Sequence, residues 1–371
     1  MTATASQWRD LFAGTATPAQ TVRLRVVQKR GREFLILPIN ARAAVAALEL
    51  YPAQTSRARA ARLLLKCFLA TGFAPGTHRT EVPVSMDAPL VRFIRQFEGR
   101  ESLPPFAILA GNPAAPGRRF LVALFDDNGT PRRIIKAGLE PDAHALVRHE
   151  SNILKQIQTA VPAAPRWQAE FTVENFEAFA TEFISGPSPH SASPDQLSRQ
   201  LTPWLDLKTT VLVQNLPAWQ RLRAVCRPSE EFRLLESRCC QRTILPALYH
   251  GDFAPWNIKE DASGNWRIVD WERGEFQGPP AWDWFHYVTQ PLFLVSKSPV
   301  DTAVQSLEDH LASDPFQRYA AAAQVREFLS NWYWAYLLYS RHVLVQTEQV
   351  ARLDALLNLL REGRALKRFT V

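Results

Sequence analysis

A helix predicted over residues 141–158 carries a carboxylate, Glu150, inside its apolar stripe. The other members of this stripe are Leu146, Ile153, Leu154 and Ile157. Because Glu150 lies three or four positions from its neighbours in the stripe, its side chain faces the core, where an unpaired charge is costly. The fold must therefore bring a cation to Glu150, and the best-placed candidate is Lys136, in the apolar run before the helix.

The residues on either side of this helix predict a small β-rich lobe. Three apolar runs precede the helix and predict an antiparallel meander: FAILAG from residue 106, RRFLVALFD from residue 118 and PRRIIKAG from residue 131. Two strand-like runs follow near residues 167–173 and 178–184. The next segment, TEFISGPSPHSASPD, is rich in glycine, proline and serine, so we expect a hinge near residues 183–188.

The remainder of the chain is predicted to be mostly helical, interrupted by a hairpin across the turn DASGN. The 371 residues exceed the usual size of one domain, about 100 to 200 residues. We therefore divide the chain into a β-rich lobe over residues 101–185 and a helical lobe over residues 186–371. Residues 1–100 form an additional α/β segment before these lobes.

This first segment is basic, with 15 Lys and Arg against 6 Asp and Glu. A hairpin is predicted over residues 21–38 and helices over about 41–50 and 56–70. The last helix places Arg59, Arg62 and Lys66 on one side, which we interpret as a solvated face, and Leu63, Leu64 and Phe68 are available for packing. Any anionic partner, such as a nucleic acid or a membrane surface, is expected to meet this segment.

Composition limits the class of protein. No stretch approaches the roughly 20 apolar residues of a membrane span, and the N-terminus lacks a basic region followed by an apolar one, so no secretory signal is predicted. The four cysteines have no zinc-site spacing, and neighbouring Cys239 and Cys240 suit a bridge poorly. We expect a protein of the reducing cytoplasm.

Two acidic motifs carry the candidate chemistry. Asp252 and Asn257 lie five positions apart in HGDFAPWN, on a turn broken by Pro255, and Asp270 ends the apolar strand WRIV. Carboxylate and amide oxygens suit Mg²⁺, which prefers one or two carboxylates together with substrate phosphates. A second carboxylate that binds no metal can orient a hydroxyl group.

HGDFAPWN followed by IVDWE resembles the signature of the aminoglycoside phosphotransferase and choline kinase group of protein-kinase-like enzymes. The resemblance implies that Asp252 accepts the proton of a substrate hydroxyl and that Asn257 and Asp270 bind Mg²⁺. It also implies a two-lobed α+β fold. The expected activity is transfer of the γ-phosphate of ATP or GTP to a small-molecule hydroxyl, with a sugar, amino sugar or amino alcohol as acceptor.

The same resemblance assigns roles in the β-rich lobe. Lys136 becomes the lysine that holds the nucleotide phosphates, and Glu150 becomes its helix partner. The loop GNPAAPGRR corresponds to the family's phosphate loop, in which this chain keeps Gly111 and Gly117. The resemblance covers about residues 104–345.

Two rival functions stay open at this point. One is a catalytically silent kinase-like protein that binds or scaffolds, and the other is an anion-binding module in the basic segment with the kinase-like part as its regulator. Hydrolysis of the nucleotide that depends on Asp252 would favour the enzyme. Salt-sensitive binding of anionic partners confined to residues 1–100 would favour the module.

Other residues near the motifs have simpler interpretations. His250 is interpreted as a structural residue that shapes the turn by hydrogen bonding, and Asp283 either braces the catalytic turn or caps a helix. Glu272 and Arg273 either act at the site or form a local salt bridge. The aromatic run NWYWAYLLY, residues 331–339, is predicted to be core, and no function is assigned to His286, His310 or His342.

Overall fold

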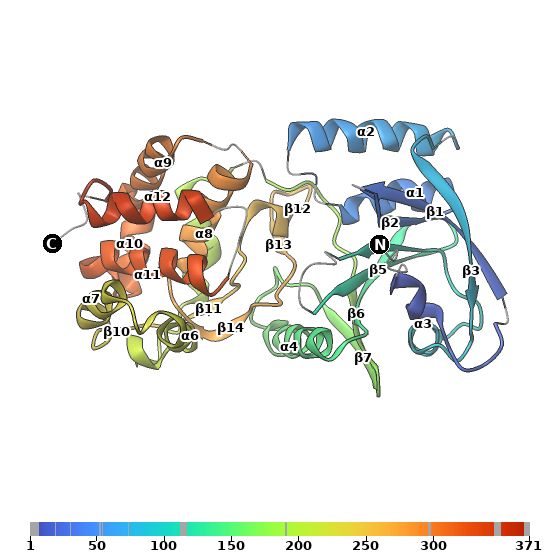
Figure 1. The fold of residues 1–371 in the computed structure, drawn as a ribbon, viewed down its shortest axis with the longest axis horizontal. Coiled ribbons are helices and arrows are strands. Elements are labelled where there is room, and N and C mark those ends of the chain that lie inside the picture. Colours follow the sequence, from blue (N-terminus) through green and yellow to red (C-terminus); the bar gives the residue numbers. More distant parts are fainter. Residues whose placement is uncertain are drawn as a thin grey trace. The chain divides into compact units, whose positions relative to one another are not determined.

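The computed structural model divides the chain into two compact units (Figure 1). It describes residues 7–18, 20–29, 31–51, 53, 55–72, 74–111, 117–189, 191–295, 298–344 and 350–366. Unit 1 comprises residues 1–187 and 259–272, and unit 2 comprises residues 188–258 and 273–371. The first is built on a large antiparallel sheet and the second is mainly helical, so the predicted α+β class with two lobes is confirmed.

Unit 1 is organised by an eight-stranded sheet in the order β3-β1-β2-β4-β5-β6-β8-β7. Every neighbouring pair in it is antiparallel. The strands are β1 (Gln20–Lys29), β2 (Arg32–Pro38), β3 (Thr77–Val84), β4 (Phe106–Ala110), β5 (Arg119–Phe125), β6 (Pro131–Gly138), β7 (Trp167–Val173) and β8 (Phe176–Glu182). The predicted hairpin and the predicted meander are both present.

The boundary predicted near residue 100 does not separate two compact units. Strand β2 pairs with β4 through Leu35 opposite Leu109 and Ile36 opposite Ile108, so the sheet runs without a break from the basic segment into the β-rich lobe. Because β2 and β4 are joined by backbone hydrogen bonds, β4 has no exposed edge on that side, and the basic segment and the β-rich lobe form one sheet. Residues 1–100 therefore belong to unit 1.

The sheet of unit 1 is covered on both faces. Along β2 the buried side chains alternate, so Ile36 joins one core with the short 3₁₀ helix Gln7–Phe12 and α3 (Pro89–Glu98), whereas Leu35 and Leu37 join another with α1 (Ala41–Ala47). Ile134 of β6 packs against this second core. Lys136, two residues later, lies on the same face of the sheet as Ile134.

Helix α4 (Pro141–Ile157) matches the predicted helix. It begins with Pro141, whose missing N–H costs nothing at a first helical position, and it packs mainly against β8 and β6. Its buried residues include Val147, Glu150 and Leu154. The helix therefore turns Glu150 toward the core of unit 1, as its position in the stripe predicted.

Helix α2 (Ser56–Ala70) has the predicted bounds but not the predicted packing. Leu63 and Leu64 are 61% and 60% exposed, and Phe68 is also exposed. Among the residues of α2, only Leu69 is buried. The expectation that Leu63, Leu64 and Phe68 pack into a core is wrong, because α2 contacts unit 1 through its opposite side.

The hairpin after the HGDFAPWN motif returns to unit 1. Strand β12 (Ile258–Glu260) pairs with β13 (Trp266–Ile268) across the predicted DASGN turn. Ile268 donates its backbone N–H to the carbonyl of Ala163 at 2.8 Å, and Glu260 donates to the carbonyl of Pro187 at 2.9 Å. The residues that follow β13 are thereby held in unit 1.

Unit 2 is a helical assembly with short two-stranded sheets, β9 (Val211–Leu212) with β10 (Thr243–Ile244) and β11 (Ala247–Tyr249) with β14 (Glu275–Gly278). Its helices are α5 (Pro194–Leu201), α6 (Pro217–Cys226), α7 (Glu230–Cys239), α8 (Trp282–Leu294), α9 (Val300–Ala312), α10 (Asp314–Ala322), α11 (Leu329–His342) and α12 (Val350–Arg361). The run NWYWAYLLY lies in α11 and is largely buried, so its assignment to the core is confirmed.

Within the described ranges, no helix has the length and apolar character that a membrane crossing requires. The cysteines Cys67, Cys226, Cys239 and Cys240 are free thiols, consistent with their unsuitable spacing.

Candidate functional site

The lysine and glutamate singled out in the sequence form a buried ion pair in unit 1. Lys136 Nζ lies 2.7 Å from each carboxylate oxygen of Glu150, and the Glu150 side chain is 2% exposed. Strand β6 supplies the lysine and α4 the glutamate. The cation demanded by the buried carboxylate is therefore the residue that the sequence predicted.

Asp270 joins the same pair from the segment after β13. Its Oδ1 lies 2.6 Å from Lys136 Nζ, and the backbone N–H of Trp271 donates to Glu150 Oε1 at 3.0 Å. Asp270 has a φ of 72°, a left-handed conformation that costs energy for any residue with a Cβ. Strand β13 ends two residues earlier, at Ile268, and the side chain of Asp270 remains 37% exposed.

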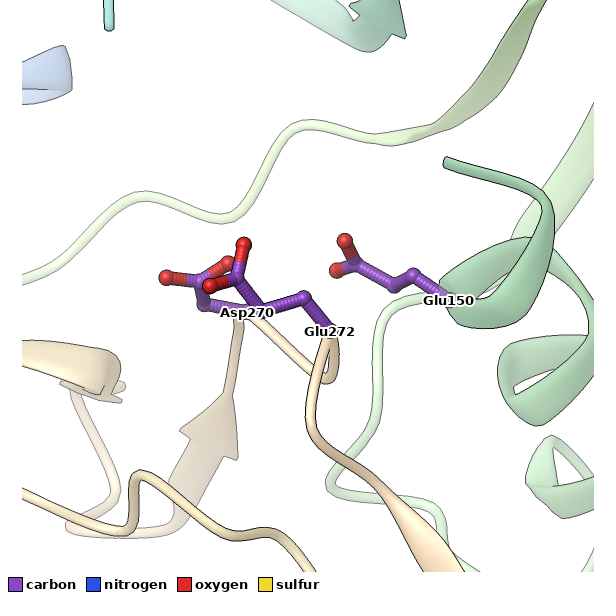
Figure 2. A group of neighbouring side chains, drawn as sticks. All are labelled: Glu150, Asp270 and Glu272. Carbon is purple, nitrogen blue, oxygen red and sulfur yellow. The ribbon is translucent and has the colours of Figure 1, made fainter. Parts of the chain in front are cut away.

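A third carboxylate completes the cluster in unit 1. Figure 2 shows Glu150 extending from α4 toward Asp270 and Glu272, which come from one segment. Single carboxylate oxygens of these three residues lie within 4.8 Å of one another. Arg119 at the start of β5 pairs with Glu272 at 2.5 Å. The open question about Glu272 is answered in part, because it forms a salt bridge and also belongs to the cluster.

The charges in this cluster depend on one another. Burial lowers the pKa of Lys136, but Asp270 and Glu150 outweigh it, so the pKa of the ammonium is raised above its ordinary value. Burial and the neighbouring charge of Asp270 raise the pKa of Glu272 to about 7, although Arg119 opposes the shift. Lys136 is therefore firmly protonated and holds the two acidic side chains that it touches.

The two glycines of the predicted phosphate loop bound a segment whose interior, residues 112–116, lies outside the described residues. Gly111 donates its N–H to the carbonyl of Arg119 at 3.2 Å, which closes the β4–β5 connection. Gly117 has a φ of 64°, and a Cβ there would lie 2.9 Å from the carbonyl oxygen of Asp142 at the start of α4. Glycine is required at position 117 by both conformation and space.

The HGDFAPWN turn is a separate hydrogen-bonded structure in unit 2. Asn257 donates its side-chain N–H groups to the backbone carbonyl and to Oδ2 of Asp252, both at 2.9 Å. The backbone N–H of Asp252 donates to Nδ1 of His250 at 3.2 Å, so the structural role predicted for His250 is confirmed. Because the amide nitrogen of Asn257 serves the turn, its oxygen is the atom that can coordinate a cation.

Asp283 braces this turn from α8. Its two carboxylate oxygens accept the backbone N–H groups of His250 at 2.7 Å and Gly251 at 3.0 Å. The N-cap of α8 is Ala281, so of the two interpretations of Asp283 the bracing role holds. Burial raises the pKa of Asp283 to about 7, although both N–H groups oppose the shift.

Sequence reasoning missed His286, which the structure places against Asp252. His286 Nε2 lies 3.0 Å from Asp252 Oδ1, and its Nδ1 lies 3.2 Å from the hydroxyl oxygen of Tyr336 on α11. The search for metal-ligand spacing could not reveal this contact. A usable signal was the separation of three residues from Asp283, since residues three apart share one face of a helix.

Comparisons with known proteins find similar solved structures but no match in sequence. No protein-family model matches the chain, and a search of curated protein sequences finds no significant relative. Similar solved structures include an ethanolamine kinase from Plasmodium vivax, with 12% identity, coverage of 90% of this chain and 95% of that one, and a TM-score of 0.47.

Two further similar structures represent the two named families. An aminoglycoside phosphotransferase from Streptomyces rimosus is 14% identical, with coverage of 72% of this chain and 98% of that one and a TM-score of 0.42. A choline kinase from Cryptosporidium parvum is 12% identical, with coverage of 71% and 93% and a TM-score of 0.40.

Proposed function

We propose that this protein is a Mg²⁺-dependent phosphotransferase that moves the γ-phosphate of ATP or GTP to a hydroxyl group of a small molecule. The observation that carries the proposal is the buried contact of Lys136 with both Glu150 and Asp270. Three residues from distant motifs, each assigned a separate role by the resemblance, meet in unit 1. A structural salt bridge alone would not require the acidic residue with a strained backbone.

In unit 1, Lys136 holds the phosphates of the nucleotide and Glu150 keeps the ammonium in place. The donor set fits Mg²⁺, because Asp270 offers a carboxylate that is partly open to solvent and Glu272 offers another within 4.8 Å. When bound, Mg²⁺ neutralises charge on the phosphate oxygens of the nucleotide. Gly111 and Gly117 are proposed to let the backbone approach the same phosphates, as the resemblance implies.

In unit 2, Asp252 is proposed as the acceptor of the substrate's proton, and Asn257 as the metal ligand of that turn. The oxygen of the substrate hydroxyl forms a bond to the γ-phosphorus while the bond from that phosphorus to the bridging oxygen breaks. The hydroxyl proton moves to Asp252, and the nucleoside diphosphate leaves with the bridging oxygen. Positioning and charge neutralisation supply the rate enhancement of such a step.

The acceptor is proposed to be a sugar, amino sugar or amino alcohol. This proposal rests on the His-Gly-Asp triplet at residues 250–252. In the family that the motifs resemble, this triplet favours a small-molecule acceptor over a protein acceptor. The pocket for the acceptor varies among proteins of one fold, so its chemistry has to be measured.

The proposal is tested by incubating the purified chain with Mg²⁺ and ATP or GTP, alone and with panels of sugars and amino alcohols. We expect a nucleotide-dependent rise in melting temperature and formation of nucleoside diphosphate that increases with a true acceptor. Asp252→Asn should keep nucleotide binding and lose turnover by about 10²- to 10⁴-fold, the usual contribution of a general base. Asp270→Asn should lose both.

Asp309→Asn is the matched control, because this aspartate is bonded to Gln305 on the surface of α9. It should change neither binding nor turnover. Binding of the nucleotide without turnover in the wild type would identify the silent scaffold instead. The absence of any Mg²⁺-nucleotide effect on the wild type and on Asp270→Asn would refute the proposal.

A further inference from the structure

The carboxylate of Asp252 is held on both oxygens by side chains of unit 2. Asn257 donates to Oδ2 at 2.9 Å, and His286 Nε2 lies 3.0 Å from Oδ1. The side chain of His286 is fully buried, whereas that of Asp252 is 23% exposed. The imidazole ring thus contacts the inner oxygen of a carboxylate whose other parts reach solvent.

The far side of the His286 ring is fixed by Tyr336. Its hydroxyl oxygen lies 3.2 Å from Nδ1 of His286. The phenol ring packs against the aromatic rings of Trp282, Phe285 and Tyr333, with centroid distances of 6.1, 5.7 and 5.7 Å. Burial raises the pKa of Tyr336, so the hydroxyl keeps its proton. The ring therefore has a donor in a fixed position.

The hydrogen bonds determine where the protons lie. An ionised Asp252 only accepts hydrogen bonds, so the Nε2 that faces it has to carry a proton. If the ring is neutral, Nδ1 has no proton and accepts one from the hydroxyl of Tyr336. The chain of hydrogen bonds runs from Tyr336 through His286 to Asp252.

We propose that His286, held by Tyr336, is a positioning residue that fixes the carboxylate of Asp252 through its Nε2–H donor. The inference rests on the proposed function of Asp252 as the proton acceptor. Nε2 of His286 and the amide of Asn257 each hold one oxygen of the carboxylate, so its orientation is fixed, and no proton moves through His286.

The experiment compares substitutions that remove or restore this donor. His286→Leu removes it, His286→Gln returns an N–H at about the same reach, and Tyr336→Phe removes the hydroxyl that fixes the ring. We expect His286→Leu to lower kcat by about 10²-fold and leave the KM for the nucleotide nearly unchanged, because a misplaced catalytic group slows chemistry. His286→Gln should recover most of the loss, and Tyr336→Phe should have a smaller effect than His286→Leu.

The same two helices supply a matched control. The hydroxyl groups of Thr289 on α8 and Tyr333 on α11 lie 3.2 Å apart in a buried hydrogen bond that does not include Asp252. Thr289→Val and Tyr333→Phe should lower stability without lowering kcat. If they lower kcat as much as His286→Leu, or if His286→Gln is no better than His286→Leu, the positioning role is wrong.

A spectroscopic measurement separates this inference from the proposed function. In ¹⁵N-histidine-labelled full-length protein, the ring signals of His286 are assigned from their loss in His286→Gln. We expect the Nε2–H tautomer in the wild type and a clear shift of its signal in Asp252→Asn. A wild type without transfer activity but with these signals overturns the proposed function alone. An Nδ1–H tautomer or a signal unaffected by Asp252→Asn overturns the inference.

Discussion

The two units stabilise their acidic groups in different ways. In unit 1 the carboxylates of Glu150 and Asp270 surround a cation, Lys136, at 2.6 to 2.7 Å. In unit 2 the carboxylates of Asp252 and Asp283 accept hydrogen bonds from side-chain and backbone N–H groups. One arrangement depends on charge and the other on oriented dipoles.

The difference corresponds to the two kinds of chemistry that we propose. A cationic centre suits the binding of phosphate, and carboxylates beside it suit the binding of a metal ion. A neighbouring cation favours the ionised form of a carboxylate, so it makes that carboxylate a weaker proton acceptor. Neutral donors orient such a carboxylate at less cost to its basicity.

The largest predicted effect on stability concerns the cation of unit 1. Lys136→Met leaves Glu150 buried with an unpaired charge, so we expect the free energy of unfolding to fall by about 3–5 kcal/mol. Lys136→Met with Glu150→Met should recover much of this loss, since apolar side chains of similar size replace the whole pair. Urea denaturation of the two variants and of the wild type measures both changes.

Lys155 on α4, the helix that carries Glu150, provides the control for this prediction. It pairs with Glu170 at 2.5 Å, and the side chains of that pair are 31% and 48% exposed. Lys155→Met should cost no more than about 1 kcal/mol, as for other exposed pairs. Equal losses in Lys136→Met and Lys155→Met would contradict the view that unit 1 depends on a buried cation.

A smaller effect is expected from Asp283 in unit 2. Asp283→Asn places an amide NH₂ against one of the two backbone N–H groups that the carboxylate accepts, and leaves that donor without a partner. We expect a loss of about 1–3 kcal/mol in the free energy of unfolding, the usual cost of a buried unsatisfied donor. A loss as large as that of Lys136→Met would remove the distinction between the two units.

The pH dependence of this loss tests the same residue. The pKa of Asp283 is raised from 3.8 to about 7 in the folded chain, so the unfolded chain releases this proton first as the pH rises. The wild type should therefore lose up to about 1.4 kcal/mol per pH unit from this group between its unfolded and folded pKa values. The asparagine of Asp283→Asn does not titrate, so the stability of this variant does not fall with pH through this group. The difference in the free energy of unfolding between the wild type and Asp283→Asn should therefore become smaller as the pH rises toward neutral, as measured by urea titrations.

Much of unit 1 could be predicted because its signals are local. The strands from β4 to β8 and helix α4 follow from apolar periodicity, and the position of Glu150 in the stripe of α4 identified its need for a cation. The pairing of β2 with β4 could not be predicted, since it joins segments about 70 residues apart and periodicity carries no information about partners. The same limitation explains the exposed apolar side of α2.

The residues of the site could be predicted where a sequence motif identifies them by its spacing. Residues that only tertiary packing brings to the site were harder to predict. Lys136, Glu150 and Asp270 were identified and are brought together, and the bracing role of Asp283 was one of two interpretations. His286 was missed, because its contact with Asp252 depends on how α8 packs against the HGDFAPWN turn. Glu272 was left undecided, because its position two residues after Asp270 does not reveal that Arg119 lies beside it.

The smallest predicted effect concerns the backbone at Asp270, which has a φ of 72°. Gly251 in the HGDFAPWN turn of unit 2 also has a left-handed φ, of 79°, and so does Ala281, at 68°. At position 270 a glycine would be relaxed, and the aspartate adds a carboxylate that contacts Lys136. Asp270→Gly and Asp270→Ala both remove this carboxylate and its contact with Lys136, and both should lose transfer activity. The difference in the free energy of unfolding between these two variants reports on the backbone conformation at position 270. We expect Asp270→Gly to be more stable than Asp270→Ala by about 1 kcal/mol.

Asp309 on α9 provides a control for this last prediction, because there the glycine variant should be the less stable of the two. Within a helix glycine is less favourable than alanine by about 1 kcal/mol, so Asp309→Gly should be less stable than Asp309→Ala. Both pairs of variants are compared by urea denaturation under one set of conditions. If alanine is at least as stable as glycine at position 270 as well, the aspartate is not strained. The contrast between a turn of unit 1 that keeps strain for its carboxylate and a turn of unit 2 relaxed by glycine would then be lost.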